Sequence, residues 1–347
     1  MDQAGLNVQL LEAAEAGSLE LVQQLCNLGA NVLCADTEGI SCLMKAAENG
    51  HAQIVECLLQ LGAPWNQLDN DGYCAGEYAS KHKDIAELLL HWGVQAELLL
   101  ADEAREEAAS GGSSTSHANT SYLEQKLHYS ESGDTLLDAD GEGVMMGWEK
   151  PLMLRHAELI CSRTCGGGDI LNIGFGLGII DEAIQSHNPT THTIVEAHPD
   201  VYAHMIEKGW GQRPGVRILF GRWQDVLPCM GTYSGIFFDT YGEYYEELRT
   251  FQRQLPTLLR QGGCYSFFNG LAPDNIFFHS VYCRLVQLEL ESVGLSTRYT
   301  PMNIRALGAD VWEDINPYWK FETYFLPECR FIKPSSEAPA AESHGEK

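Results

Sequence analysis

The sequence predicts two folded parts, an all-α repeat domain followed by an α/β domain built around a largely parallel sheet. The first prediction rests on a 33-residue internal repeat within the first hundred residues. The second rests on alternating strand-like and helix-like segments after residue 150. One of these strands runs directly into three glycines at alternate positions, Gly174, Gly176 and Gly178. With 347 residues, the chain is long enough for two such cores.

The N-terminal repeat keeps one register over several positions. Residues 11–22 align with residues 44–55, and the Asp/Gly turn at 36–39 recurs at 69–72. A shortened third copy ends near Gly93. Two short helices and a turn in each unit resemble ankyrin repeats, in which small alanines let the helices stack closely. We therefore expect residues 1–100 to form ankyrin repeats. The resemblance implies a platform that docks a protein, and a bare scaffold packed on the second domain is the alternative.

Composition separates three further segments. Residues 101–121 combine charged residues with a Ser/Gly/Thr-rich run, which predicts a flexible linker. Residues 334–347 are rich in Pro, Ala, Ser and Glu, which predicts a disordered tail. Residues 122–333 lie between them and are expected to form the α/β domain.

The α/β domain should consist of strands and helices in alternation, which is typical of a parallel sheet covered on both faces. Two late strand-like runs, 296–300 and 322–332, are expected to form an antiparallel hairpin at one edge of the sheet. The expected strands are 169–173, 193–195, 216–220, 233–238 and 263–269. The expected helices are 151–162, 180–185, 199–208, 245–259 and 274–293.

Charge and cysteine content limit the function classes. The net charge is −26, and residues 1–150 contribute most of it, with 25 acidic and 6 basic side chains. Such a field disfavours nucleic acid and anionic membranes and favours a basic partner, although a merely solubilising surface is the alternative. The 11 cysteines are scattered, and the spacing of Cys161 and Cys165 is not completed by further ligands, so no metal site is expected.

No apolar leader and no run of 18 apolar residues is present in this sequence. We therefore expect a cytoplasmic protein, and entry into the nucleus is left open.

The three glycines and the acid that follows the next apolar run, Glu196, predict a nucleotide-type cofactor at the first turn of a doubly wound sheet. Dinucleotide enzymes need a glycine at position 179, where this chain has Ile179. The Gly-x-Gly-x-Gly spacing is instead typical of Rossmann-like, class I S-adenosylmethionine-dependent methyltransferases. Asp225 follows the third expected strand, where this fold offers an acid to the adenine amino group. Taken singly, the glycines could form only a tight turn, Glu196 could be a surface acid and Asp225 could cap a helix.

More specific stretches follow in a recognisable order. Residues 144–153 (Val-Met-Met-Gly-Trp-Glu-Lys-Pro-Leu-Met) resemble the entry segment of guanidinoacetate methyltransferases. Residues 172–179, 194–196, 222–226 and 238–241 match that family in the same order. Together with the repeats, and with Leu136-Leu137-Asp138 before the entry segment, the chain resembles the type IV protein arginine N-methyltransferases. This arginine N-methyltransferase 2 group modifies the internal δ nitrogen.

The resemblance implies roles for individual residues toward S-adenosylmethionine. The sequence departs from the pattern at Asn172, where many methyltransferases place an acid, and at Gln224, which replaces an acid but still donates and accepts hydrogen bonds. The methionine and ribose side would be lined by Phe175, Gly176, Leu177, Gly178, Ile179 and Ile180. Glu196 would hold the ribose hydroxyls with Ala197 and His198 beside it, Trp223 and Gln224 would surround the adenine, and Tyr129, Met145 and Met153 would close the pocket.

Two acids are candidate catalytic residues, Glu149 from the entry segment and Asp239 from the end of the fourth strand. A guanidinium is a poor nucleophile because it is protonated and its lone pairs are delocalised. Two carboxylates can orient its planar fork and assist loss of a proton. Asp239 is also expected to contact the cofactor. In structural terms, Glu149 could be a helix N-terminal acid, Asp239 a turn residue and Tyr241 either a cover or packing.

The hypothesis from the sequence is thus an enzyme that methylates the δ nitrogen of arginine in a basic protein recruited by the repeats, and the family resemblance implies a ribosomal protein as the candidate. One alternative is a small-molecule guanidine methyltransferase of the guanidinoacetate type. A second is a catalytically inactive interaction scaffold.

Overall fold

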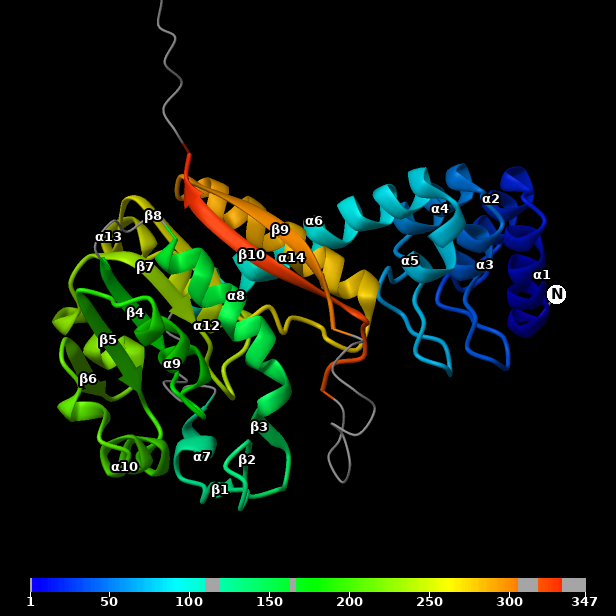
Figure 1. Ribbon diagram of the computed structural model, residues 1–347. Helices are drawn as coiled ribbons and strands as arrows, with labels where there is room; N and C mark the ends of the chain where they lie inside the picture. The colour runs from blue at the N-terminus through cyan, green and yellow to red at the C-terminus, as the bar shows by residue number, and fades with distance from the viewer. Residues whose placement is uncertain (1, 110–118, 163–166, 305–317, 333–347) are drawn as a thin grey trace, which may run out of the picture. The chain divides into compact units, whose positions relative to one another are not determined.

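The computed structural model describes residues 2–109, 119–162, 167–304 and 318–332 (Figure 1). The chain divides into two compact units. The first comprises the N-terminal segment together with Gly270–Leu288 and residues 318–322. The second comprises residues 119–269, 289–304 and 323–332. Within these ranges, no helix is both long enough and apolar enough to cross a membrane.

The first unit is built from helix pairs, as the repeat predicts (Figure 1). Its equivalent turns are stabilised alike: His51 Nε2 lies 3.0 Å from the Glu15 carbonyl, and His82 Nε2 lies 3.0 Å from the Glu48 carbonyl. A Cβ on Gly17 would lie 2.5 Å from the His51 ring, so glycine is required there. The helices are α1 (Gln3–Glu15), α2 (Leu19–Asn27), α3 (Cys42–Glu48), α4 (Ala52–Gln60), α5 (Ala75–Tyr78) and α6 (Lys83–Ala109).

A helix from late in the chain completes this unit. Helix α14 (Ile276–Ser292) carries Phe277, whose ring would be 2.1 Å from a Cβ added at Gly76 of α5. The neighbouring Phe278 packs edge-on against Trp65, with ring centroids 5.5 Å apart. The last layer of the repeat unit is therefore supplied by residues that the sequence analysis attributes to the α/β domain.

The predicted linker and tail coincide only partly with described residues. Helix α6 continues to Ala109, so residues 101–109 extend the helix. Residues 110–118 and the expected tail at 334–347 lie outside the described residues, and α7 (Thr120–Leu123) follows.

The second unit contains a seven-stranded sheet of order β6-β5-β4-β7-β8-β10-β9. The strands from β6 to β8 are parallel, and β10 pairs antiparallel with both β8 and β9. This confirms the predicted fold class, including the late hairpin. The strands are β4 (Asp169–Ile173), β5 (Thr191–Glu196), β6 (Val216–Phe220), β7 (Tyr233–Phe238), β8 (Leu259–Phe267), β9 (Leu295–Asn303) and β10 (Thr323–Phe331).

Chain order reverses at β4, which lies between β5 and β7. Ligands bind at such a point, beyond the carboxyl ends of the strands. The connecting helices are α8 (Lys150–Cys161), α9 (Ile179–Ser186), α10 (Pro199–Glu207), α11 (Trp223–Val226), α12 (Tyr245–Gln252) and α13 (Leu255–Leu258).

A small second sheet was not predicted. It contains β1 (His128–Tyr129), β2 (Thr135–Leu137) and β3 (Gly143–Met146), paired antiparallel. In Figure 1 it lies near α7 and α10, at the end of the unit toward which β4 and β5 point. These short strands carry the entry segment to the carboxyl edge of the large sheet.

Candidate active site

The turn after β4 can be formed only by glycines. Gly174 has φ +90°, and a Cβ there would lie 1.7 Å from the Asp239 carbonyl oxygen. Gly176 has φ +56°, and its Cβ would lie 2.6 Å from the Met145 sulfur. Gly178 has φ +73° and begins α9, with the Phe175 ring against it. The backbone is thus left-handed at all three positions, which strains any other residue.

Glu196 closes this turn from the end of β5. Its Oε2 accepts a hydrogen bond from the Phe175 backbone at 2.9 Å, and its Oε1 accepts one from the His198 backbone at 2.6 Å. Ala197 lies between Glu196 and His198 in the chain, and its backbone N–H also donates to the Glu196 carboxylate. Burial raises the pKa of Glu196, and these hydrogen bonds oppose that effect. A carboxylate held by backbone N–H groups still has lone pairs for hydroxyl donors.

His198 and Asn172 support the turn from within. The buried His198 accepts from the Asp200 backbone through Nδ1, so its Nε2 donates to the Tyr122 carbonyl at 3.2 Å. The buried Asn172 donates its amide to the Gly174 carbonyl at 2.8 Å and to Asp181 at 2.9 Å. Asn172, at the position of the missing acid, therefore braces the glycine turn.

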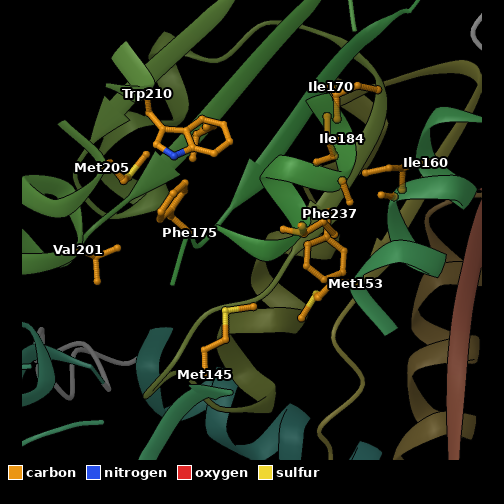
Figure 2. Close-up of a cluster of buried hydrophobic side chains, with 14 of the residues drawn as sticks. Met145, Met153, Ile160, Ile170, Phe175, Ile184, Val201, Met205, Trp210 and Phe237 are labelled. Atoms are coloured by element: carbon orange, nitrogen blue, oxygen red, sulfur yellow. The ribbon is translucent and has the colours of Figure 1, made fainter. Parts of the chain in front are cut away.

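Apolar residues of the entry segment reach the same turn. The Met145 sulfur accepts the Leu177 backbone N–H at 3.2 Å. Met145, Met153 and Phe175 belong to one buried cluster with Ile180 (Figure 2), and Leu177, Ile179 and Tyr129 pack against it. The Tyr129 ring stacks on His204 at 4.2 Å. Burial, and to a smaller extent the Glu196 charge, raise the pKa of Tyr129.

Glu149 lies in a 3-10 turn (Gly147–Glu149) immediately before α8. It is 3% exposed, and its Oε1 accepts the Met146 backbone N–H at 2.9 Å. The side chain therefore caps the 3-10 turn that leads into α8. This hydrogen bond ties Glu149 to Met146. The neighbouring Met145 lies against Gly176.

Asp239 follows β7, and its N–H donates to the Ile173 carbonyl at 2.9 Å. Burial of the carboxyl group, which disfavours its charged form, raises the pKa of Asp239 to about 7, although part of the residue is still accessible to solvent. Its carbonyl contacts Gly174, whereas Glu149 is joined to the same glycine turn through Met145 and Met146. Both candidate acids therefore adjoin one turn.

The residues after β6 meet an acid that sequence reasoning missed. Trp223 is buried, and its indole N–H donates to Glu243 Oε2 at 3.2 Å. Gln224 Nε2 donates to Glu243 Oε1 at 3.1 Å. Asp225, by contrast, is exposed and lies 3.6 Å from Arg222. Glu243 lies in no motif, so only its position three residues after Thr240, in the loop beyond β7, could have drawn attention to it.

A second missed contact covers the loop after β7. The Tyr241 hydroxyl donates to Asp138 Oδ2 at 3.1 Å, and its ring lies 4.8 Å from that of Tyr122. Asp138 belongs to the turn between β2 and β3, and it also accepts two backbone N–H groups within that turn. Tyr241 therefore joins the loop that also carries Asp239 to the turn between β2 and β3.

These residues fit an adenosine-type cofactor. The glycine turn lets a ligand approach the backbone, and Glu196 offers hydrogen-bond acceptors beside it. Gln224 Oε1 is buried without a hydrogen-bond partner among the described residues, so it can accept from a ligand.

Comparison with known proteins agrees with this geometry. The family model of guanidinoacetate N-methyltransferase matches residues 113–288, and a model of three ankyrin repeats matches residues 10–99. A curated relative from Aspergillus oryzae, named "Protein arginine N-methyltransferase 2", is 33% identical over 317 residues, which cover 78% of this chain and 76% of the relative. The chain belongs to the protein arginine N-methyltransferase 2 family.

Two further curated relatives with the same name are also similar to this chain. The relative from Cryptococcus neoformans is 35% identical, with 93% of this chain and 94% of the relative covered. The relative from Yarrowia lipolytica is 40% identical over 242 residues, with 66% of this chain covered. The match spans only about half of the Yarrowia protein, 51% of its length.

Proposed function

We propose that the chain is an S-adenosylmethionine-dependent methyltransferase that modifies the δ nitrogen of arginine in a basic protein, with ribosomal proteins as the candidate substrates. The proposal rests on one observation: two acids, Glu149 and Asp239, both adjoin the glycine turn after β4. Membership of the protein arginine N-methyltransferase 2 family supports the methyl-transfer class.

The cofactor would supply an electrophilic methyl group on its sulfonium. The glycine turn and Glu196 would hold its methionine and ribose portions, and Trp223 and Gln224 would surround its base. On the substrate side, Glu149 and Asp239 would pair with guanidinium N–H groups and orient one nitrogen. Asp239, whose pKa of about 7 lies near neutrality, is the better placed of the two to accept a proton.

The repeats would recruit the protein substrate. Residues 1–150 carry 25 acidic and 6 basic side chains, so the N-terminal part attracts a Lys/Arg-rich partner. Docking there would raise the local concentration of the target arginine. We place the protein in the cytoplasm, with entry into the nucleus left open.

A second candidate is a small-molecule guanidine methyltransferase, which the match to the guanidinoacetate N-methyltransferase model favours. Radiolabelled methyl transfer to guanidinoacetate and to a basic ribosomal protein fraction separates the two. We expect label in protein, and mass spectrometry of the modified arginine should give δ-methylarginine. Label in guanidinoacetate alone would establish the second candidate. Failure to bind S-adenosylmethionine would indicate an inactive scaffold.

A further inference from the structure

Glu243 accepts three hydrogen bonds, two from residues of α11 and one from the loop after β7. The Thr240 hydroxyl donates to its Oε2 at 2.8 Å, the Trp223 indole N–H to the same oxygen at 3.2 Å, and the Gln224 amide to Oε1 at 3.1 Å. An indole N–H can only donate, so Glu243 must accept at that oxygen. The carboxylate therefore joins the segment after β6 to the loop after β7, which it contacts at Thr240, the residue that follows Asp239.

This arrangement determines which way the Gln224 amide faces. A carboxylate accepts from the amide nitrogen and repels the amide oxygen, so Glu243 selects one of the two orientations of the amide. In that orientation Gln224 Oε1 is buried and has no hydrogen-bond partner among the described residues. A buried carbonyl without a donor is costly, which indicates that a bound ligand supplies the donor.

We propose that Glu243 is a positioning residue that holds Gln224 with its carbonyl oxygen presented to the cofactor base, so that the chain selects a 6-amino over a 6-oxo purine. The inference rests on the proposed function, because it assumes that the cofactor base lies at Gln224. The amine of adenine donates a hydrogen bond to this oxygen. The carbonyl of hypoxanthine would instead place one acceptor against another.

The test compares two ligands that differ only at the base, S-adenosylhomocysteine and S-inosylhomocysteine. Their dissociation constants would be measured with the full-length chain by equilibrium dialysis, which needs no methyl transfer. The wild-type chain should prefer the adenosine ligand by roughly tenfold or more, the usual effect of leaving a buried polar group unpaired. Glu243→Gln should reduce the preference several-fold, because a carboxamide can also donate to Gln224 Oε1 and so permits the flipped amide.

Two variants isolate the effect. Glu246→Gln removes a carboxylate three residues after Glu243, in α12, where Glu246 is exposed and pairs with Arg249. This variant should keep the wild-type preference. In a Gln224→Ala background, Glu243→Gln should cause no further loss. Glu243→Leu, which removes the acceptor, serves as the second variant if the first does not fold, and it should show the same reduced preference.

The outcomes distinguish the two proposals. A wild-type chain that binds neither ligand would contradict the proposed function itself. If the wild type binds S-adenosylhomocysteine preferentially but the Glu243 variants weaken both ligands by the same factor, Glu243 has only a structural role and the positioning inference fails. Equal binding of both ligands by the wild type also overturns the inference.

Discussion

At the scale of single residues, Asp239 offers the sharpest test of the proposed chemistry. Its surroundings raise the pKa of the carboxyl to about 7. The ionised form is the one that pairs with a guanidinium and accepts a proton, so activity should increase as the pH rises through about 7. Asp239→Asn should lower methyl transfer by about a hundredfold or more, the usual contribution of an acid–base group. Rates measured from pH 6 to pH 8 check both expectations.

The control for this prediction is cofactor binding. Asp239→Asn keeps the backbone contacts of Asp239 with Ile173 and Gly174, so S-adenosylhomocysteine binding should be largely unchanged. If the variant retains wild-type turnover, or if the rise in rate near pH 7 persists in it, Asp239 is not the group responsible.

Residues inside local motifs could be predicted from the sequence, whereas their cross-loop partners could not. The three glycines and the acid after β5 follow from spacing, because a strand, a tight turn and a helix have local requirements. Glu243 and Asp138 act through hydrogen bonds to Gln224 and Tyr241, which lie 19 and 103 positions away in the chain. Such contacts arise only when loops from different strands meet.

At the scale of elements, a directional hydrogen-bond chain joins α8 to β8 and β10. The Ser266 hydroxyl donates to the Pro327 carbonyl, so it accepts from His156 Nδ1 at 2.7 Å. His156 Nε2 therefore accepts from the Tyr324 hydroxyl at 2.9 Å, which in turn accepts the Asn269 backbone N–H at 2.8 Å. These hydrogen bonds fix a neutral histidine tautomer in the middle of α8, the helix that follows Glu149.

This buried histidine should make stability sensitive to acid. Burial lowers the pKa of His156 to about 3, whereas the unfolded chain has a value near 6.5. Between these values the unfolded state binds a proton that the folded state does not, so stability is lost as the pH falls below about 6.5. The loss is at most about 1.4 kcal/mol per pH unit.

The measurement is urea unfolding at pH 7 and pH 5, compared between the wild type and His156→Gln. The variant should lose less free energy of unfolding on acidification, by up to about 2 kcal/mol, while other titrating groups cancel in the comparison. Identical losses in both proteins would show that His156 does not carry this dependence.

Most elements were predictable within a few residues because their apolar periodicity is local. β4, β6 and β7 have the expected bounds, and β9 with β10 forms the expected hairpin. The small sheet was missed because strands of two to four residues carry no usable alternation. The sheet contacts the glycine turn through Met145 of β3, whose sulfur accepts the backbone N–H of Leu177, a residue 32 positions away in the chain.

At the scale of the whole molecule, the repeat unit is not a self-contained N-terminal module. Its last layer includes α14, whose Tyr282 donates to Glu97 at 3.3 Å, and Asn275, directly before this helix, donates its amide to Glu77 at 2.7 Å. Terminal repeats need a capping element because an open end exposes the apolar core. A segment from residues 270–288 provides that cap, which a repeat search along the sequence cannot recognise because the segment has no repeat pattern.

Phe277→Ala in the full-length chain should therefore loosen the repeats from their C-terminal side. Loss of this buried ring, which contacts Gly76, should cost about 3 kcal/mol or more of local stability. Hydrogen exchange should show faster amide exchange in α5 and in the first turns of α6, and less change in α1, because repeat arrays transmit stability between nearest neighbours. The matched control is Ile276→Ala on the same helix, whose side chain is exposed and should leave exchange unaltered. Unchanged protection of α5 in the Phe277 variant would mean that the repeats do not depend on α14, and the independent N-terminal module inferred from the sequence would then be the better description.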